Sequence, residues 1–262
     1  MVKAMNTAAT GMVAQQMNID NIANNLANVN TTGFKKGRVE FQDILYQNYR
    51  KAGTATAIGT QVPVSLDVGY GARAVATTRE FSSGSMMVTG NATDLAIGGI
   101  GFFQIQMPDG TTAYSRDGSF KISGEGTLVT SDGFSVLPTV SIPENATEIS
   151  VAIDGQVHVM VAGNETPQQI GQLELARFIN SGGLSAVGHN LYVETVASGA
   201  PITGIPASEG FGRLDQGTLE SSNVSVVDEM VNMIMAQRSY EINSKVIQTS
   251  DDMAQTTNNL KR

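Results

Sequence analysis

The sequence contains no cysteine and no tryptophan, and only 6% of its 262 residues are aromatic. The absence of cysteine excludes disulfides, thiolate metal sites and cysteine nucleophiles. It leaves the cellular compartment open, because exported and cytosolic chains can both avoid thiols. The two histidines, His158 and His189, lack the H-x-x-x-H spacing of a zinc site. We therefore expect no metal centre and no cofactor.

Charge is also scarce. Charged residues make up 15% of the chain, the net charge is −8, and there is no long basic run. Nucleic acid and anionic membranes are therefore not expected as partners. Serine, threonine, asparagine, glutamine and glycine must cover much of the surface. Such a surface is common where neighbouring molecules bury a protein again, and it fits a low-charge soluble protein equally well.

Long apolar runs are missing as well. No stretch approaches the roughly 20 apolar residues that a membrane helix requires, so we expect no membrane insertion. The first seven residues carry one lysine and no continuous apolar segment of the kind found in a cleavable signal peptide. If the protein works outside the cytoplasm, we expect export by a route that reads an uncleaved N-terminus.

Helical periodicity is what the two ends of the chain do contain. Apolar residues return at three-to-four spacing within residues 1–33 and again within 217–262. Such a narrow stripe favours a partner helix over a broad core. We expect the two terminal helices to pair in a coiled-coil-like manner and to pack on copies of themselves. The predicted contact residues are Met5, Met12, Ile19, Ile22, Leu26, Val29, Val227, Val231, Ile234, Ile242, Val246, Met253 and Leu260.

Asparagine crowds the second half of the first predicted helix, although it is a poor helix former. Asn18, Asn21, Asn25 and Asn28 recur at 3-4-3 spacing, one position away from the apolar stripe. Two interpretations remain open. The residues form either a solvated polar face or an amide ladder that hydrogen-bonds to other subunits.

Residues 34–67 predict an extended linker followed by an arm. The arm, residues 52–63, has no periodicity and few large side chains, so alone it predicts a loop. Such a segment becomes ordered only by docking on other subunits. The predicted inter-subunit contacts are Ala52, Gly53, Thr54, Ile58 and Pro63.

Residues 68–216 read as short strands separated by tight-turn dipeptides such as Asp117-Gly118 and Asp132-Gly133. This pattern predicts an all-β middle domain, and the whole chain is then an α+β protein with paired terminal helices. Turn formation accounts for these aspartates without catalysis. Gly98 to Gln104 lacks the third glycine of a phosphate loop. We find no catalytic residues and expect a protein that is not an enzyme.

Several blocks of the sequence resemble the bacterial flagellar rod and hook proteins. The N-terminal signature of that family is similar to Asn24–Lys35. Its middle domain is similar to four stretches: Gly101–Gln104, Pro108–Gly110, Tyr114–Phe120 and Leu128–Thr130. Its C-terminal helix is similar to three more: Gly217–Val224, Glu229–Val231 and Gln237–Glu241. The blocks are ordered and cover nearly the whole chain.

Within that family, the total length and residues 46–63 resemble the distal-rod members. Proximal rod or hook-type subunits are the alternative. Outside the family, the alternative is a β binding module that dimerises through its helices. The resemblance implies a straight helical homopolymer in the periplasm-spanning rod, which transmits motor torque to the hook. It also implies type III export and contacts with proximal rod proteins, hook or hook-junction subunits, surrounding ring (bushing) proteins and the rod cap.

Overall fold

A computed structural model describes residues 2–57, 60–161, 166–208 and 210–260. The chain divides into two compact units. The first contains the described residues among 1–27, 37–78 and 225–262, and the second those among 28–36 and 79–224. The two ends of the chain therefore share one unit, although the whole β-rich region separates them in the sequence.

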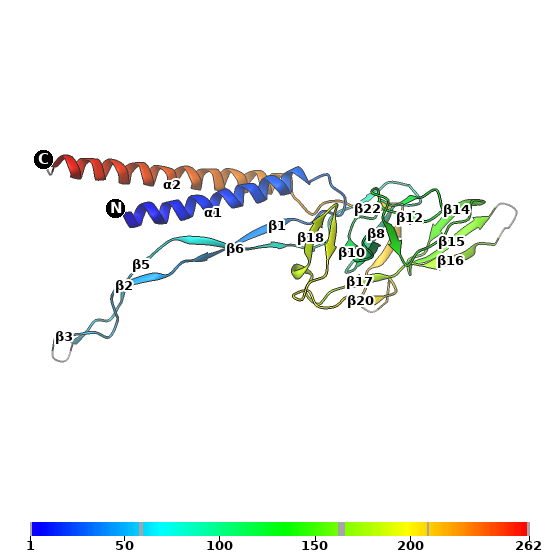
Figure 1. The fold of residues 1–262 in the computed structure, drawn as a ribbon, viewed down its shortest axis with the longest axis horizontal. Coiled ribbons are helices and arrows are strands. Elements are labelled where there is room, and N and C mark those ends of the chain that lie inside the picture. The colour runs from blue at the N-terminus through cyan, green and yellow to red at the C-terminus, as the bar shows by residue number, and fades with distance from the viewer. Residues whose placement is uncertain (1, 58–59, 162–165, 209, 261–262) are drawn as a thin grey trace. The chain divides into compact units, whose positions relative to one another are not determined.

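The first unit consists of two helices and a long two-stranded hairpin (Figure 1). Helix α1 packs against α2 and against strand β1. Along the hairpin, β1 pairs with β6, β2 with β5, and β3 with β4. The helix pairing and the α+β class are as predicted. The elements are α1 (Val2–Ala27), β1 (Gly37–Asp43), β2 (Tyr46–Arg50), β3 (Ala55–Ala57), β4 (Thr60–Gln61), β5 (Leu66–Gly69), β6 (Ala72–Arg79) and α2 (Val226–Leu260).

Helix α2 begins where a capping residue places it. The Asp228 N–H donates to Ser225 Oγ at 3.4 Å, so the serine covers a backbone donor that the helix leaves unpaired. The helix occupies residues 226–260 of the predicted C-terminal segment 217–262, and the residues before it are not helical. Residues Thr218–Glu220 instead form strand β22, which pairs with β7 (Met86–Val88) in the second unit.

Helix α1 ends at Ala27, earlier than the predicted end at Gly33. Gly33 has a φ of +67°, and a Cβ there would lie 2.6 Å from the Asp117 backbone nitrogen. Glycine is needed at this position for a close backbone approach inside the second unit, not as the helix cap.

The predicted linker and arm are part of the hairpin. The Gly53 N–H donates to the Val62 carbonyl at 2.8 Å, and the Val62 N–H donates to the Thr54 carbonyl at 3.0 Å. Backbone pairing of this kind requires no apolar periodicity, so the side-chain pattern did not reveal it. Because β6 pairs with β1, residues 72–78 lie in the helical unit and not in the predicted 68–216 domain.

The second unit is built around β9, which pairs with β10, β13 and β17. The main sheet has the order β11-β12-β13-β9-β10-β19-β18, with β17 attached at β9 and β20 paired with β17. Strands β14, β15 and β16 form a separate sheet, and β8 pairs with β21. The bounds are β8 (Leu95–Gly98), β9 (Phe102–Gln106), β10 (Thr112–Ser115), β11 (Lys121–Ile122), β12 (Leu128–Val129), β13 (Ser135–Leu137), β14 (Ala146–Val151), β15 (Gln156–Val161), β16 (Gln168–Gln172), β17 (Leu175–Arg177), η1 (Ser181–Gly183), β18 (Ser185–Gly188), β19 (Leu191–Val193), β20 (Ile202–Gly204) and β21 (Arg213–Gln216).

Both faces of this sheet are buried at its central strands β9 and β10, while the outer strands β11 and β18 are exposed. On β9, Phe103 belongs to the larger apolar cluster and Phe102 to the smaller one. On β10, Ala113 and Tyr114 divide in the same way. Successive side chains of a strand point to opposite faces, so an unbroken apolar run is what a doubly covered sheet requires.

Candidate functional site

The two helices pack on each other through small and polar residues. The buried residues of α2 are Glu229, Ala236 and Ser250, which lie at seven-residue multiples. Asn243 falls in the same series, and a Cβ on Gly11 of α1 would come within 2.9 Å of its amide nitrogen. We call this series the seam. Two of its four members, Ala236 and Ser250, have small side chains, which allow a close approach of the two backbones.

A buried hydrogen bond joins the two helices at one end of the seam. Asn25 Nδ2 near the end of α1 donates to Glu229 Oε2 near the start of α2, at 3.1 Å. Gly11, nearer the start of α1, lies against Asn243, further along α2. The two helices are therefore antiparallel.

The predicted apolar stripe of α2 does not form this contact. Its members are exposed in the single chain, from 39% for Val246 to 82% for Leu260. They are Val227, Val231, Ile234, Ile242, Val246, Met253 and Leu260. Binding of the stripe to copies of the chain stays a prediction.

The stripe of α1 is more covered. Ile22 is 4% exposed, while Met5, Met12, Ile19 and Leu26 are half-buried. Val29 lies beyond the end of α1, in the second unit. The α1 stripe is thus largely covered in the single chain, whereas the α2 stripe is exposed.

Three of the four ladder asparagines make hydrogen bonds within the chain, and in one of these bonds Asn28 Oδ1 accepts from Thr31 Oγ1 at 3.2 Å. Asn21 Nδ2 and Asn25 Nδ2 donate to the Gly37 carbonyl at 2.7 and 2.9 Å. Asn25 Oδ1 accepts from the Gly37 N–H at 2.9 Å. These amides hold the start of β1 against α1, a use that neither sequence interpretation included. Asn18 is half-buried, and Asn28 lies past the end of α1.

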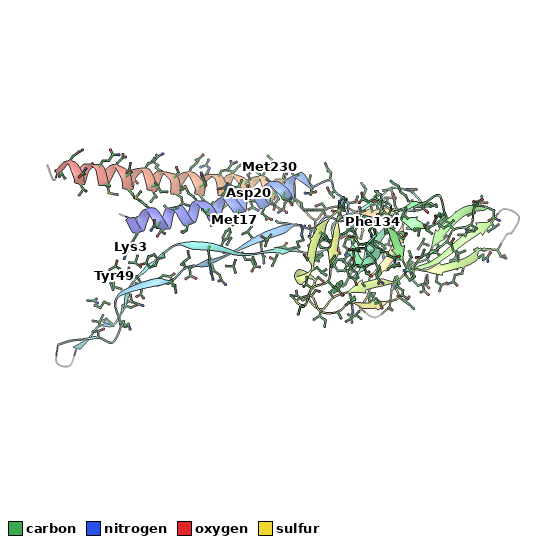
Figure 2. The ribbon with its side chains drawn as sticks, viewed as in Figure 1. Lys3, Met17, Asp20, Tyr49, Phe134 and Met230 are labelled. Atoms are coloured by element: carbon green, nitrogen blue, oxygen red, sulfur yellow. The ribbon has the colours of Figure 1, made fainter. Side chains whose placement is uncertain are left out.

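A lysine near the start of α1 binds the hairpin. Lys3 Nζ donates to Gln47 Oε1 and to the Tyr49 hydroxyl. It also lies 4.7 Å from the Tyr49 ring centroid and 5.9 Å from that of Tyr70. The hydrogen bond to Tyr49 raises the pKa of the Lys3 ammonium. Figure 2 shows Lys3 and Tyr49 on facing elements. No local pattern in the sequence predicts this contact.

In the described part of the arm, Val62 is only 5% exposed and pairs through its backbone with Gly53 and Thr54. Ala52, Gly53, Thr54 and Pro63 are exposed. Thr54 Oγ1 donates to the Lys51 carbonyl at 2.6 Å. The fifth predicted contact, Ile58, lies outside the described residues. Docking of the arm on other subunits remains a prediction.

A buried charge cluster joins the three parts of the chain that carry the family resemblance. Lys35 Nζ lies 2.7 Å from Glu220 Oε1, and an Arg116 Nη lies 3.4 Å from Glu220 Oε2. The side chains of Lys35 and Glu220 are fully buried and that of Arg116 is 3% exposed. Burial lowers the pKa of Lys35 and of Arg116, and the charge of Glu220 opposes this effect in both.

Backbone groups complete the cluster. Lys35 Nζ donates to the Ser82 carbonyl at 2.7 Å, and the Gly84 N–H donates to Glu220 Oε1 at 2.9 Å. The Gly33 N–H donates to the Glu220 carbonyl at 2.8 Å. No substrate can reach charges that are buried this completely, so the cluster serves the fold.

The cluster leads to a prediction about the second unit, which contains the main sheet and is called the β-rich unit below. A fragment of residues 68–216 lacks Lys35 and Glu220, and so leaves Arg116 buried without a counter-charge. We expect a fragment of residues 28–224 to be more stable towards urea by about 3–5 kcal/mol, the usual cost of breaking a buried ion pair. Equal unfolding midpoints and slopes for the two fragments would contradict the assigned unit boundaries.

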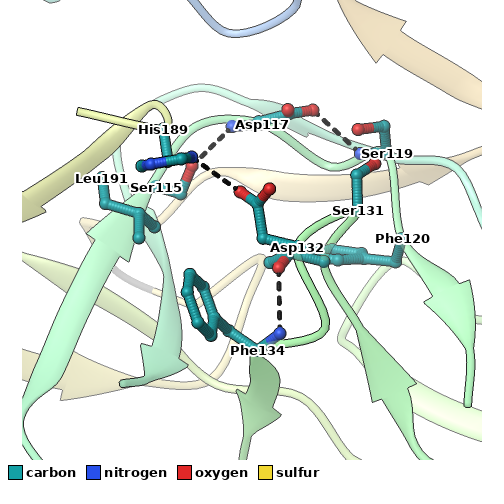
Figure 3. A pocket seen from close by; sticks show the side chains of 10 residues that line it. Ser115, Asp117, Ser119, Phe120, Ser131, Asp132, Phe134, His189 and Leu191 are labelled. Atoms are coloured by element: carbon teal, nitrogen blue, oxygen red, sulfur yellow. Dashed lines mark hydrogen bonds and ion pairs between the residues drawn. The ribbon is translucent and has the colours of Figure 1, made fainter. Parts of the chain in front are cut away.

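A small pocket in the second unit contains a contact between His189 and Asp132 (Figure 3). His189 Nδ1 lies 3.1 Å from Asp132 Oδ2, and both side chains are substantially exposed. Ser115 Oγ donates to the Asn190 carbonyl at 2.9 Å and accepts from the Asp117 N–H at 3.1 Å. The pocket volume is about 40 Å³, room for little more than a water molecule. The two side chains form a contact at the protein surface.

Across the described ranges, no three or more acidic or histidine side chains gather as metal ligands would. Neither described helix combines the length and the apolar character needed to cross a membrane.

Three family models match separate parts of the chain. "Flagella basal body rod protein" matches residues 5–35, and "Flagellar hook protein FlgE/F/G D1 domain" matches residues 96–159. "Flagellar basal body rod FlgEFG protein C-terminal" matches residues 215–260. The matched segments cover most of α1, part of the second unit, and α2.

Curated relatives match over most or all of their length. The chain is 55% identical to flagellar basal-body rod protein FlgG of Borreliella burgdorferi, over 100% of both chains. It is 47% identical to FlgG of Caulobacter vibrioides, over 99% of this chain and 100% of the relative. To flagellar basal-body rod protein FlgF of the same organism it is 32% identical, over 91% and 89%. The chain, with its paired terminal helices and β-rich unit, belongs to the flagellar basal-body rod protein family.

Proposed function

We propose that the chain is the structural subunit of the distal rod, the straight shaft of the flagellar basal body that transmits motor torque to the hook. One observation carries the proposal. The terminal helices form a unit whose α2 stripe is left exposed, in a chain that is more similar to FlgG than to FlgF of one organism. This contrast also favours the distal-rod assignment over a proximal rod subunit.

The exposed apolar surface of α2, which includes the stripe, supports self-assembly. Eleven large apolar side chains of α2 are each between 39% and 82% exposed. Apolar patches above a few hundred Å² mark interaction sites on soluble proteins. Burial is worth roughly 25 cal/mol per Å², and a polymer repeats the gain at every subunit.

Family membership implies that the chain assembles with other rod and hook components in the basal body. The finer partners we propose are proximal rod proteins, hook or hook-junction subunits, ring proteins around the rod, the rod cap and the export apparatus. The location is the periplasm-spanning rod.

Electron microscopy of purified protein at increasing concentration tests the proposal. We expect straight tubes above a threshold concentration. A β binding module that dimerises through its helices would stay a dimer. Discrete dimers without tubes at every concentration would contradict the proposal.

The arm is proposed to make the tube stiff. Its exposed residues lie at the far end of a hairpin whose inner ladders, β1–β6 and β2–β5, are independent of it. Docked between neighbours, the arm would resist the sliding that bending requires. Deleting residues 52–63 should leave urea stability unchanged and give curved or flexible tubes in micrographs.

A matched variant replaces the same residues by an equal length of glycine and serine, which separates arm length from arm sequence. Straight tubes of undiminished stiffness from the deletion variant would show that the arm is an ordinary loop.

A further inference from the structure

An apolar groove runs along α1 on the side that faces the hairpin. Two adjoining hollows of about 350 and 480 Å³ form it and share Met17 and Ala74. Val13 and Met17 are 55% and 48% exposed within it. Met17 is labelled in Figure 2. The lining residues of α1 run from Ala9 to Asn21, a length of about 18 Å at ~1.5 Å per residue.

The first part of the α2 stripe has the spacing that such grooves bind. Val227, Val231 and Ile234 stand at i, i+4 and i+7 and are 71%, 50% and 51% exposed. They span about 10 Å of helix. Val231 lies about 140° around the helix from the buried seam residue Ala236. A helix that binds a groove uses anchors at this spacing.

We propose that Val227, Val231 and Ile234 of one copy dock in the α1–hairpin groove of the next copy. This inference rests on the proposed function, since it specifies a contact by which copies assemble. The occupant must come from another molecule. The α2 of the same chain already contacts α1 through its seam, so its stripe faces away from that α1.

Charges on the two surfaces set the direction of docking. Exposed Arg73 lines the groove beside Ala9 to Ala14, and exposed Asp20 lines its other end. Exposed Asp228 follows Val227, and exposed Arg238 lies one turn beyond Ile234. If the docked α2 runs parallel to α1, Asp228 meets Arg73 and Arg238 meets Asp20. The opposite direction places like charges together.

The contact is heterologous, because the groove and the stripe are different surfaces. A heterologous contact leaves a free groove at one end and a free stripe at the other, so copies add in sequence. It produces a ring or an open helical polymer, whereas a self-complementary contact would stop at a dimer.

Disulfide trapping tests the contact, and the absence of cysteine gives a clean background. Tubes are assembled from equal amounts of Met17→Cys and Ile234→Cys chains, oxidised, and run on a non-reducing gel. Parallel docking brings these positions together, within the roughly 7 Å Cα separation that a disulfide allows. The matched control mixes Met17→Cys with Val227→Cys, which lies a helical length of about 10 Å away. We expect at least tenfold more linked dimer for the first pair.

A charge exchange supplies a second readout that needs no cysteine. Asp228→Arg and Arg73→Glu should each raise the concentration at which tubes appear, by about three- to tenfold, because each replaces an attraction by a repulsion. The double variant should return it to within about twofold of the original. Lys121→Glu on β11 makes the same charge change as Arg73→Glu in the other unit and should have no effect.

The outcomes separate this inference from the proposed function. Tubes that form with equal trapping of both cysteine pairs, or without rescue in the double variant, would overturn the docking and leave the rod assignment standing. An unmodified chain that forms no tubes at any concentration would overturn the rod assignment, and the docking with it.

Discussion

Replacing Glu220 by leucine should lower the free energy of unfolding of the β-rich unit by about 3–5 kcal/mol, the range measured when one member of a buried ion pair is removed. Glu220 faces two cations, Lys35 and Arg116, which are almost completely buried. The leucine would leave both without their counter-charge and would leave the Gly84 N–H without its acceptor. Urea unfolding of the full chain, followed by a probe in the β-rich unit, measures the loss.

Glu148→Leu is the matched control, since Glu148 is exposed on β14 in the same unit. Surface substitutions of this kind stay within about 0.5 kcal/mol. Lys35→Met should cost less than Glu220→Leu, because Arg116 and Glu220 still pair. Similar losses for the Glu220 and Glu148 variants would refute a stabilising role for the cluster.

Ala236→Asp should separate the two helices in the isolated chain. Ala236 is 2% exposed and belongs to the seam, between the contacts that Glu229 and Asn243 make with α1. A carboxylate in this position finds no room beside α1 and no partner, and burying an unpaired charge costs several kcal/mol. Far-ultraviolet circular dichroism of dilute protein should show a loss of helix.

The neighbouring residue gives a close control. Met235 is 62% exposed, so Met235→Asp should leave the helix signal of the dilute chain intact. An equal helix loss in both variants would mean that the substitution acts through helix propensity and not through the seam. Full helicity in Ala236→Asp would mean that the seam does not hold the helices together.

The apolar stripes illustrate how far sequence reasoning reaches. Periodicity predicted two terminal helices and their pairing. It assigned the pairing to the largest apolar residues, yet on α2 these are exposed and Ala236 and Ser250 are buried. Closely packed helices need small side chains at the contact. A pattern of hydrophobicity does not report side-chain size or which face another helix occupies.

The hairpin and the charge cluster were hidden for a related reason. Ladders such as β2–β5 join backbone groups, so a polar, irregular side-chain pattern is compatible with them. Lys35 and Glu220 are 185 residues apart, and each alone reads as an ordinary surface charge. Their resemblance to family blocks was visible in the sequence, but the reason for it, a shared buried cluster, was not.

The sequence by itself determined the local structure and the family. Helical periodicity, turn dipeptides and the ordered family blocks are written in neighbouring residues, and short-range sterics and hydrogen bonding convert them into helices, tight turns and strands. Only the tertiary structure decided which helix face is covered, that Asn21 and Asn25 hold β1, and that Lys35, Arg116 and Glu220 meet. These contacts join distant parts of the chain, and they form because burying apolar surface brings segments together whose local patterns carry no record of each other.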